Sequence, residues 1–370
     1  MNFGTKLDAA NGRPTGFDYM RILLALSVIW MHTAQVTMGS HELIFSMPFS
    51  PFVKAILPMF FALSGFLVAG SMERSKTLIT FLGNRFVRIY PALAVEVGLS
   101  AFVIGTMFTT FPLEKYFTDK TFLLYLLNVT GHIHMKLPGV FLNNPDPDVV
   151  NVQLWTVPFE LYCYLALSIL LAIGLLKRPV MAIVGSLFFL ALCCAYRVYR
   201  YGDHWAIFPV HVPGIILISC FLVGVALYLY REKVPHRLWL FLACSAYIFW
   251  AFRFTAFGDL IAAPAVGYVT VYLGLLMPRK IALLKGADYS YGLYLYGFVI
   301  QQAIAYFPGP GRIWYVNGLV ATIISAAFAA FSWHYIEKPA LKYKSVFKKL
   351  ENAWLKRRER PIGSPQLSEV

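Results

Sequence analysis

The residues best placed to do chemistry lie in an apolar stretch near the start of the chain, FDYMRILLALSVIWMHTAQ at 17–35. This stretch carries Asp18 and Arg21 at one end and His32 deep inside. His32 follows Arg21 by about three helical turns, so both side chains project from nearly the same face, about 16 Å apart along the axis. Ionisable groups at membrane depth are costly and usually face a bundle interior or a wet cavity. A snorkelling arginine with a buried, hydrogen-bonded histidine is the alternative interpretation.

A second charged group lies in the segment FLGNRFVRIYP at 81–91. Arg85 and Arg88 are three residues apart and therefore share one helical face. Paired guanidinium groups suit phosphates, which they bind bidentately. Ordinary anchoring of a membrane helix by basic residues at its cytoplasmic end is the alternative explanation of the pair.

Two further stretches place polar residues among apolar ones. In PMFFALSGFL, Ser64 is better explained by close helix packing than by catalysis, since no base is spaced as in a nucleophile elbow. In LWTVPFELYCYL, Trp155 belongs to an interfacial aromatic belt, while Glu160 lies about six residues into the apolar run. A carboxylate at that depth needs a partner or a task.

The last polar positions lie near the end of the chain. In ADYSYGLYLYGFVIQQ, Tyr291 is polar enough to line a cavity, although tyrosines are also common at membrane edges. In SWHYIEKPAL, His334 and Glu337 are about one turn apart. Two residues make a weak metal site, so a salt bridge or a helix-end brace is the preferred interpretation. The cysteines also lack metal-binding spacing, and no metal is expected.

The composition fixes the class of protein that must position these residues. Of 370 residues, 59% are hydrophobic and 14% are charged, and the mean hydropathy is +0.63. Soluble domains contain about 25% charged residues, so this is a polytopic membrane protein. The net charge of +14 does not indicate nucleic acid, because the basic residues fall between the apolar runs.

The predicted fold is an all-α membrane bundle with about ten transmembrane helices. Apolar runs near 20 residues, the length that crosses the hydrocarbon, fall at about 19–38, 52–72, 89–111, 154–176, 180–198, 212–230, 238–254, 258–277, 289–308 and 314–336. A shorter run at 121–135 is expected to be re-entrant or interfacial.

Charge counting orients this bundle. With the N-terminus in the cytoplasm, 24 of the 32 Lys and Arg residues fall on the cytoplasmic side, so both termini are predicted there. Residues 1–342 would form the membrane domain, with a long outer loop at 112–153. Residues 343–370 would form a basic cytoplasmic tail, which either binds anionic lipid headgroups or is simply solvated.

Taken together, the motifs resemble the acyltransferase-3 family of integral membrane acyltransferases, which modify cell-envelope sugars. Six features match in the family's order: Arg21 with His32, FFALSGFL, the arginine pair before IYPAL, LWTVPFELYCYL, SYGLYLYGF and SWHYIEKPAL. The resemblance implies a ten-helix bundle that transfers an acyl group, usually acetyl, from acyl-coenzyme A. The acceptor would be a sugar hydroxyl on a lipid-linked or extracytoplasmic glycan.

The resemblance also assigns roles to residues. Arg21 and His32 match the signature pair, in which the histidine is the essential catalytic group, and Asp18 fits the same pattern. Arg85 and Arg88 match the arginines that serve the donor, with Arg21 beside them. Glu160 falls where the family's outer motif carries an acidic residue. From their places in the sequence, we expect Glu160 to be catalytic or to position the sugar, Trp155 and Tyr291 to bind substrate, and Ser64 to be a supporting residue.

These roles combine with the spacing into one hypothesis. The donor phosphates bind at the cytoplasmic mouth, and the pantetheine arm extends along the Arg21–His32 face. His32 then acts as general base or as a transient acyl carrier. The expected partners are acyl-coenzyme A, a glycan acceptor and membrane lipids, in a bacterial inner membrane. The competing classes are a proton-coupled transporter or flippase of a glycan or lipid, and a sensor or scaffold with a decayed site.

Overall fold

The computed structural model describes residues 1–40, 43–75, 77–172, 174, 179–201, 213–255, 257–284 and 286–359. Every regular element in these ranges is a helix, and none of them forms a strand. The predicted all-α class is confirmed. A helix occupies each of the ten predicted segments: α2 (Gly16–Met38), α4 (Ser50–Glu73), α5 (Leu78–Leu99), α9 (Val157–Ala172), α10 (Pro179–Tyr201), α11 (Gly214–Leu229), α12 (Leu238–Phe254), α14 (Ala263–Gly274), α15 (Ser290–Ala305) and α16 (Trp314–Ser332).

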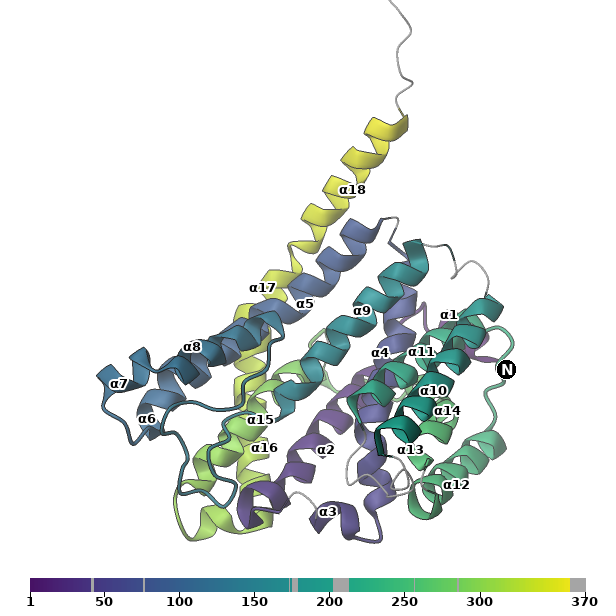
Figure 1. The fold of residues 1–370 in the computed structure, drawn as a ribbon. Helices are drawn as coiled ribbons and strands as arrows, with labels where there is room; N and C mark the ends of the chain where they lie inside the picture. The colour runs from purple at the N-terminus through teal and green to yellow at the C-terminus, as the bar shows by residue number, and fades with distance from the viewer. Residues whose placement is uncertain are drawn as a thin grey trace, which may run out of the picture.

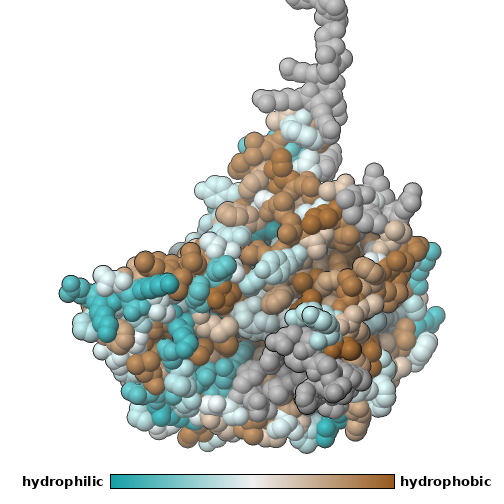
Figure 2. Space-filling view, in the orientation of Figure 1, coloured by the Kyte–Doolittle hydropathy of each residue, from teal (hydrophilic) through white to brown (hydrophobic). Residues whose placement is uncertain are grey.

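Five helical stretches are long and apolar enough to cross a membrane: Gly16–Met38, Ser50–Glu73, Leu78–Phe108, Gln153–Ala172 and Trp314–Lys356. Shorter apolar helices accompany them at Ile183–Tyr199, Gly214–Leu229 and Leu238–Phe254. Large apolar side chains point outward, and Figure 2 shows apolar surface over much of the upper part of the bundle. A bundle with an apolar exterior belongs in lipid. The count of ten crossings and the cytoplasmic side of both termini stay predictions.

Short helices connect the long ones. They are α1 (Phe3–Ala9), α3 (Leu43–Ser46), α6 (Gly105–Phe108), α7 (Leu113–Thr118), α8 (Lys120–Leu126), α13 (Gly258–Ile261) and α17 (Lys338–Leu341). The predicted outer loop contains α7, α8 and the 3₁₀ turn η2 (Leu127–Thr130), and none of these is long enough to span a bilayer. In Figure 1, α6, α7 and α8 form one edge of the bundle.

Helix α2 contacts α4, α14, α15 and α16. Beside it, α4 and α11 make the most extensive helix–helix contact. A Cβ atom added at Gly65 would lie 2.0 Å from the Phe221 carbonyl oxygen, and one at Gly224 would lie 2.1 Å from that of Ala62. A small residue of FFALSGFL, Gly65, thus permits the close packing of α4 on α11.

The tail forms one further helix, α18 (Lys344–Glu359), which packs against the start of α5. The Thr80 hydroxyl donates to the Phe347 carbonyl oxygen over 3.2 Å. A Cβ atom on Gly83 would lie 2.4 Å from the Phe347 ring. The end of α18 extends beyond the bundle (Figure 1). The division into a domain at 1–342 and a tail at 343–370 stays a prediction.

Candidate active site

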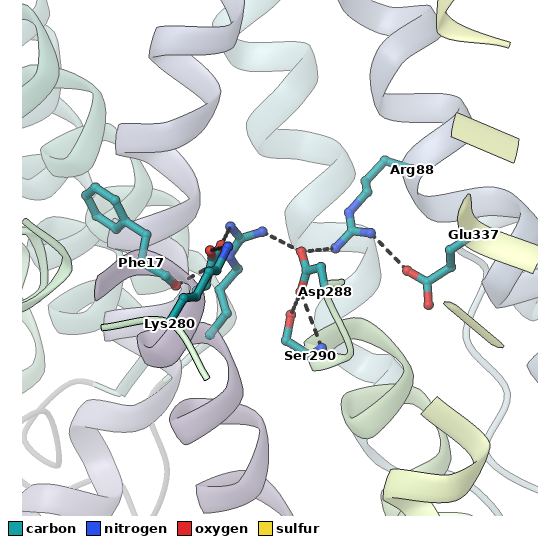
Figure 3. A network of polar contacts seen from close by, with 8 residues as sticks. Phe17, Arg88, Lys280, Asp288, Ser290 and Glu337 are labelled. Carbon is teal, nitrogen blue, oxygen red and sulfur yellow. Dashed lines mark hydrogen bonds and ion pairs between the residues drawn. The ribbon is translucent and has the colours of Figure 1, made fainter. Parts of the chain in front are cut away.

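Asp288, just before α15, joins two of the predicted arginines. Its Oδ2 accepts from Nη1 of Arg21 at 2.5 Å and from Nη2 of Arg88 at 2.7 Å (Figure 3). Its Oδ1 accepts from the Ser290 hydroxyl at 2.5 Å, at the start of α15. Burial alone would raise the pKa of Asp288, but Arg21, Arg88 and Ser290 outweigh it and hold that pKa well below its usual range.

The same contacts extend on both sides. Asp18 pairs with Arg21 at 3.0 Å and with Lys280 at 2.5 Å. At the other side, Arg88 pairs with Glu337 at 2.9 Å. We call these six residues the ion-pair chain: Lys280, Asp18, Arg21, Asp288, Arg88 and Glu337. The charges alternate in sign from one residue to the next, so the ion-pair chain is neutral as a whole.

Asp18, Arg21, Arg88 and Glu337 of the ion-pair chain were singled out from the sequence, but neither Asp288 nor Lys280 was. Asp18 and Arg21, three residues apart, form an ion pair, and the salt bridge expected at Glu337 is made with Arg88 and not with the nearby His334. Asp288 was not predicted, although its signal was present. It is an acidic residue directly before an apolar helix, at the end of the bundle where Arg21 and Arg88 also lie.

Arg85 takes a different direction from Arg88, despite their shared helical face. Its Nη2 donates to the Ser71 hydroxyl of α4 over 3.2 Å. Its guanidinium carbon lies 5.9 Å from the centre of the Tyr164 ring. Its buried Nε has no hydrogen-bond partner in the part of the chain that the structure describes. Arg85 therefore has unused donor capacity.

Tyr164 links Arg85 to Glu160, because its hydroxyl donates to the Glu160 carboxylate. It also faces Ser64 of α4. Tyr291 lies by the other arginine, with Arg88 5.8 Å from its ring centre and its hydroxyl 3.2 Å from the Ile89 carbonyl oxygen. Glu160 thus has the hydrogen-bond partner that a carboxylate within an apolar run needs. Tyr291 lies on the side of the bundle that carries the arginines.

His32 lies in a separate pocket of about 410 Å³. The pocket is lined by Met31, His32, Gln35, Phe45, Val53, Lys54, Leu57, Met135, Val152, Trp155 and Gly214. Trp155 was predicted to bind substrate and does line this pocket, whereas Glu160 and Tyr291 do not. The lining is mostly apolar with a few polar groups, which is typical of a site for an organic ligand.

The hydrogen bonds of His32 determine which nitrogen can act as a base. The ring is buried, its centre lies 5.3 Å from that of the perpendicular Phe298 ring, and Nδ1 lies 2.8 Å from the Val28 carbonyl oxygen. A carbonyl only accepts, so Nδ1 carries a proton and Nε2 is the basic nitrogen of the neutral ring. The Val28 carbonyl would also stabilise the ring after Nε2 gains a proton.

Gln35 follows His32 by about one turn and was not predicted as a site residue. Its Nε2 donates to Asp146 over 2.9 Å, while its buried Oε1 has no hydrogen-bond partner among the described residues. Asp146 belongs to the turn-rich NNPDPDVVN segment. An orphaned oxygen that lines a pocket is suited to accept from a ligand hydroxyl.

The loop that carries Trp155 is fixed by buried polar contacts. Asn151 donates to Glu96 of α5 over 2.5 Å and to the Leu295 carbonyl oxygen over 3.1 Å. Gln153 donates to the Tyr294 carbonyl oxygen over 2.9 Å, and the Tyr294 hydroxyl donates back to Gln153 over 2.7 Å. Glu96 is another buried carboxylate that was not predicted. These contacts hold the Trp155 side of the pocket against α15.

Two helices connect the pocket to the arginines. On α2, Arg21 and His32 are about 16 Å apart along the axis. On α9 and the turn before it, Trp155 and Tyr164 are about 13 Å apart, with Glu160 between them. No group of three or more His, Cys, Asp and Glu residues within the described ranges could hold a metal ion. The arrangement is a group of arginines with their carboxylate partners and an apolar pocket, connected along α2 and along α9.

The sequence was then compared with known proteins. Residues 15–334 match the acyltransferase-3 family model, which is described as an acyltransferase domain. Nodulation protein 10 of Rhizobium leguminosarum bv. viciae is 28% identical over 375 residues, covering 92% of this chain and 97% of that protein. An O-acetyl transferase of Shigella phage Sf6 is 25% identical over 347 residues, covering 89% and 96%. No solved structure matches the chain. Since the family match covers most of its length, the chain belongs to the acyltransferase-3 family and is a membrane acyltransferase.

Proposed function

We propose that the chain is an O-acetyltransferase that moves an acetyl group from cytoplasmic acetyl-coenzyme A to a sugar hydroxyl of an extracytoplasmic or lipid-linked glycan. Membership of the acyltransferase family and the phage relative named an O-acetyl transferase support this reaction type. The observation that carries the proposal is the position of His32. It lines a pocket on the same helix as Arg21, about three turns from the ion-pair chain.

The donor would bind across this distance. Its phosphates would lie by Arg85, next to Arg88 and Arg21, because guanidinium groups bind phosphate oxygens bidentately. An extended pantetheine arm is of similar length to the separation of about 16 Å between Arg21 and His32. The arm would pass Tyr291, Glu160 and Tyr164, and the thioester would reach the pocket.

The acceptor hydroxyl would enter the pocket beside Trp155. His32 Nε2 takes the hydroxyl proton while the oxygen attacks the thioester carbonyl carbon. The C–S bond then breaks, and the leaving thiolate receives the proton from the imidazolium. In the alternative two-step form, Nε2 itself attacks and carries the acetyl group to the hydroxyl. Positioned proton transfer of this kind contributes about 10²- to 10⁴-fold in rate.

The other predicted residues take supporting roles in this proposal. Asp18 and Asp288 fix the direction of Arg21. Glu160, bonded to Tyr164, positions the donor or assists proton transfer. Ser64 supports Tyr164. We place the arginine side in the cytoplasm of a bacterial inner membrane, in agreement with the distribution of basic residues.

The test needs no identified acceptor. The protein is purified in detergent and given acetyl-coenzyme A, and free thiol release is followed with and without crude envelope glycans. We expect slow release by the wild type, loss of at least a hundredfold in His32→Ala with donor binding retained, and no change in His132→Ala, an exposed histidine outside the pocket. Neither release nor donor binding by the wild type would contradict the proposal and favour a transporter.

A further inference from the structure

We propose that Lys344, the first residue of the tail helix α18, binds a donor phosphate together with Arg85, so that the tail completes the donor site. This inference rests on the proposed function. It identifies which cations are available for phosphates and adds one from outside the predicted membrane domain.

The first step concerns the arginines of the ion-pair chain. Arg21 contacts Asp18 and Asp288, and Arg88 contacts Asp288 and Glu337. Each of these guanidinium groups is therefore neutralised by two carboxylates. A phosphate would have to displace a carboxylate to bind either of them directly. The ion-pair chain is therefore better suited to fix the positions of the site residues than to bind the donor phosphates itself.

Arg85 and Lys344 differ from them in this respect. Within the described part of the chain, neither forms an ion pair. Arg85 donates only to the neutral Ser71 hydroxyl, and its buried Nε is unpartnered. The Tyr164 ring beside Arg85 carries the hydroxyl that donates to Glu160, and Arg85 itself forms no ion pair with that carboxylate. Arg85 thus keeps its charge and part of its donor set for a ligand.

The packing of the tail on α5 places Lys344 beside Arg85. Glu337 contacts Arg88, and ten residues later Phe347 packs on Gly83. The two segments therefore run antiparallel, because later residues of the tail meet earlier residues of α5. Lys344 lies one turn before Phe347, so it lies level with the turn of α5 that follows Gly83, the turn that contains Arg85. Both Arg85 and Arg88 are close enough to interact electrostatically with its ammonium group.

Cations gathered in this way repel one another, and an anion removes the repulsion. The site that they form is partly buried, where electrostatic interactions are stronger than in water. An arginine offers a bidentate fork and a lysine offers a compact point charge, so the two together suit a ligand with more than one phosphate. The diphosphate and the ribose phosphate of a coenzyme A donor meet this requirement.

The experiment compares donors with and without phosphates on the full-length protein in detergent. We expect Lys344→Gln to raise the dissociation constant of coenzyme A and the KM for acetyl-coenzyme A about tenfold. Lys344→Arg should restore most of the affinity. Turnover of S-acetylpantetheine, which lacks phosphates, should be unchanged in both variants. Lys349→Gln, an exposed lysine of the same helix, is the matched control and should match the wild type.

Several results would overturn the inference. Equal coenzyme A affinity in Lys344→Gln and wild type, with a wild type that binds and turns over the donor, would remove Lys344 but leave the proposed function intact. An equal loss with S-acetylpantetheine would show a structural role. If Lys344→Gln binds phosphatidylglycerol micelles more weakly than the wild type but binds coenzyme A equally well, Lys344 binds a lipid headgroup and not the donor. A wild type that neither binds coenzyme A nor releases thiol would overturn both proposals together.

Discussion

Arg21 and Asp288 lie 267 residues apart in the chain, yet Nη1 of Arg21 is 2.5 Å from Oδ2 of Asp288. The same oxygen accepts from Arg88, so one carboxylate ties α2, α5 and the start of α15 together. Bridging two guanidinium groups with one shared carboxylate fixes their positions before any ligand arrives. A preorganised charge arrangement of this kind lowers the cost of binding an anionic donor beside it.

The first prediction removes that shared carboxylate. Asp288→Asn should destabilise the protein by about 1–3 kcal/mol, because Arg21 and Arg88 lose charge-assisted hydrogen bonds and then repel each other. Thermal unfolding in detergent measures the change. Lys136→Ala, which breaks the exposed pair with Asp148, is the matched control, and its effect should stay below about 1 kcal/mol. Equal shifts in both variants would show that Asp288 is an ordinary surface partner.

Within the ion-pair chain, contacts between residues close in sequence could be predicted from the sequence, but contacts between distant residues could not. Asp18 and Arg21 are three residues apart, and helix geometry alone brings such side chains together. Asp288 is 200 residues from Arg88, and only the packing of α15 against α5 brings them into contact. Helical periodicity places Arg85 and Arg88 on one face. It does not determine that Arg85 meets Ser71 on α4 while Arg88 meets Asp288.

The residues around the pocket likewise divide into those that could be predicted from the sequence and those that could not. His32 and Trp155 were predicted because their types are unusual or characteristic at their depths. Gln35 was not, since a neutral amide near the end of an apolar helix looks ordinary, and its partner Asp146 is 111 residues away. Glu96 was likewise hidden within an apolar run, and its partner Asn151 comes from the loop before α9.

The second prediction concerns Gln35. Gln35→Ala should raise the acceptor KM roughly threefold to tenfold, because the pocket loses one acceptor for a ligand hydroxyl. Donor-only thiol release should stay within about twofold, since the Gln35 amide lies one turn beyond His32. The assay uses whichever envelope glycan supports turnover. Asn143→Ala, an exposed amide in the segment that carries Asp146, is the control. A matching loss of thiol release would instead place Gln35 in the donor reaction.

The third prediction compares two helical glycines. Gly65→Ala should destabilise the protein by about 1–3 kcal/mol, because the new methyl group would overlap the backbone of α11 at Phe221. Gly98→Ala has no atom within 4 Å of the added carbon and should be neutral or stabilising by about 0.5–1 kcal/mol. Thermal unfolding of both variants measures these changes in stability. A stable Gly65→Ala protein would mean that α4 and α11 separate more easily than their contact implies.

The last prediction is a pH dependence at the N-terminal helix α1. The Phe3 amide donates to the Val234 carbonyl oxygen at 3.0 Å, and His236 stacks on Tyr272 with ring centres 4.0 Å apart. Burial lowers the pKa of His236, and the nearby cationic Lys6 and terminal amine lower it further, against an opposing hydrogen bond to Tyr272. The undocked state therefore takes up a proton first as the pH falls.

Docking of α1 should accordingly be strongest above about pH 6.5, the unperturbed histidine value, and weaken as the pH falls below it. Hydrogen–deuterium exchange of the amides at 3–7, corrected for intrinsic rates, should show a few-fold loss of protection between pH 8 and pH 5.5. His236→Phe keeps an aromatic ring against Tyr272 without a titrating group, so its protection should not change over this range. The same pH dependence in His236→Phe would mean that another group controls the docking of α1.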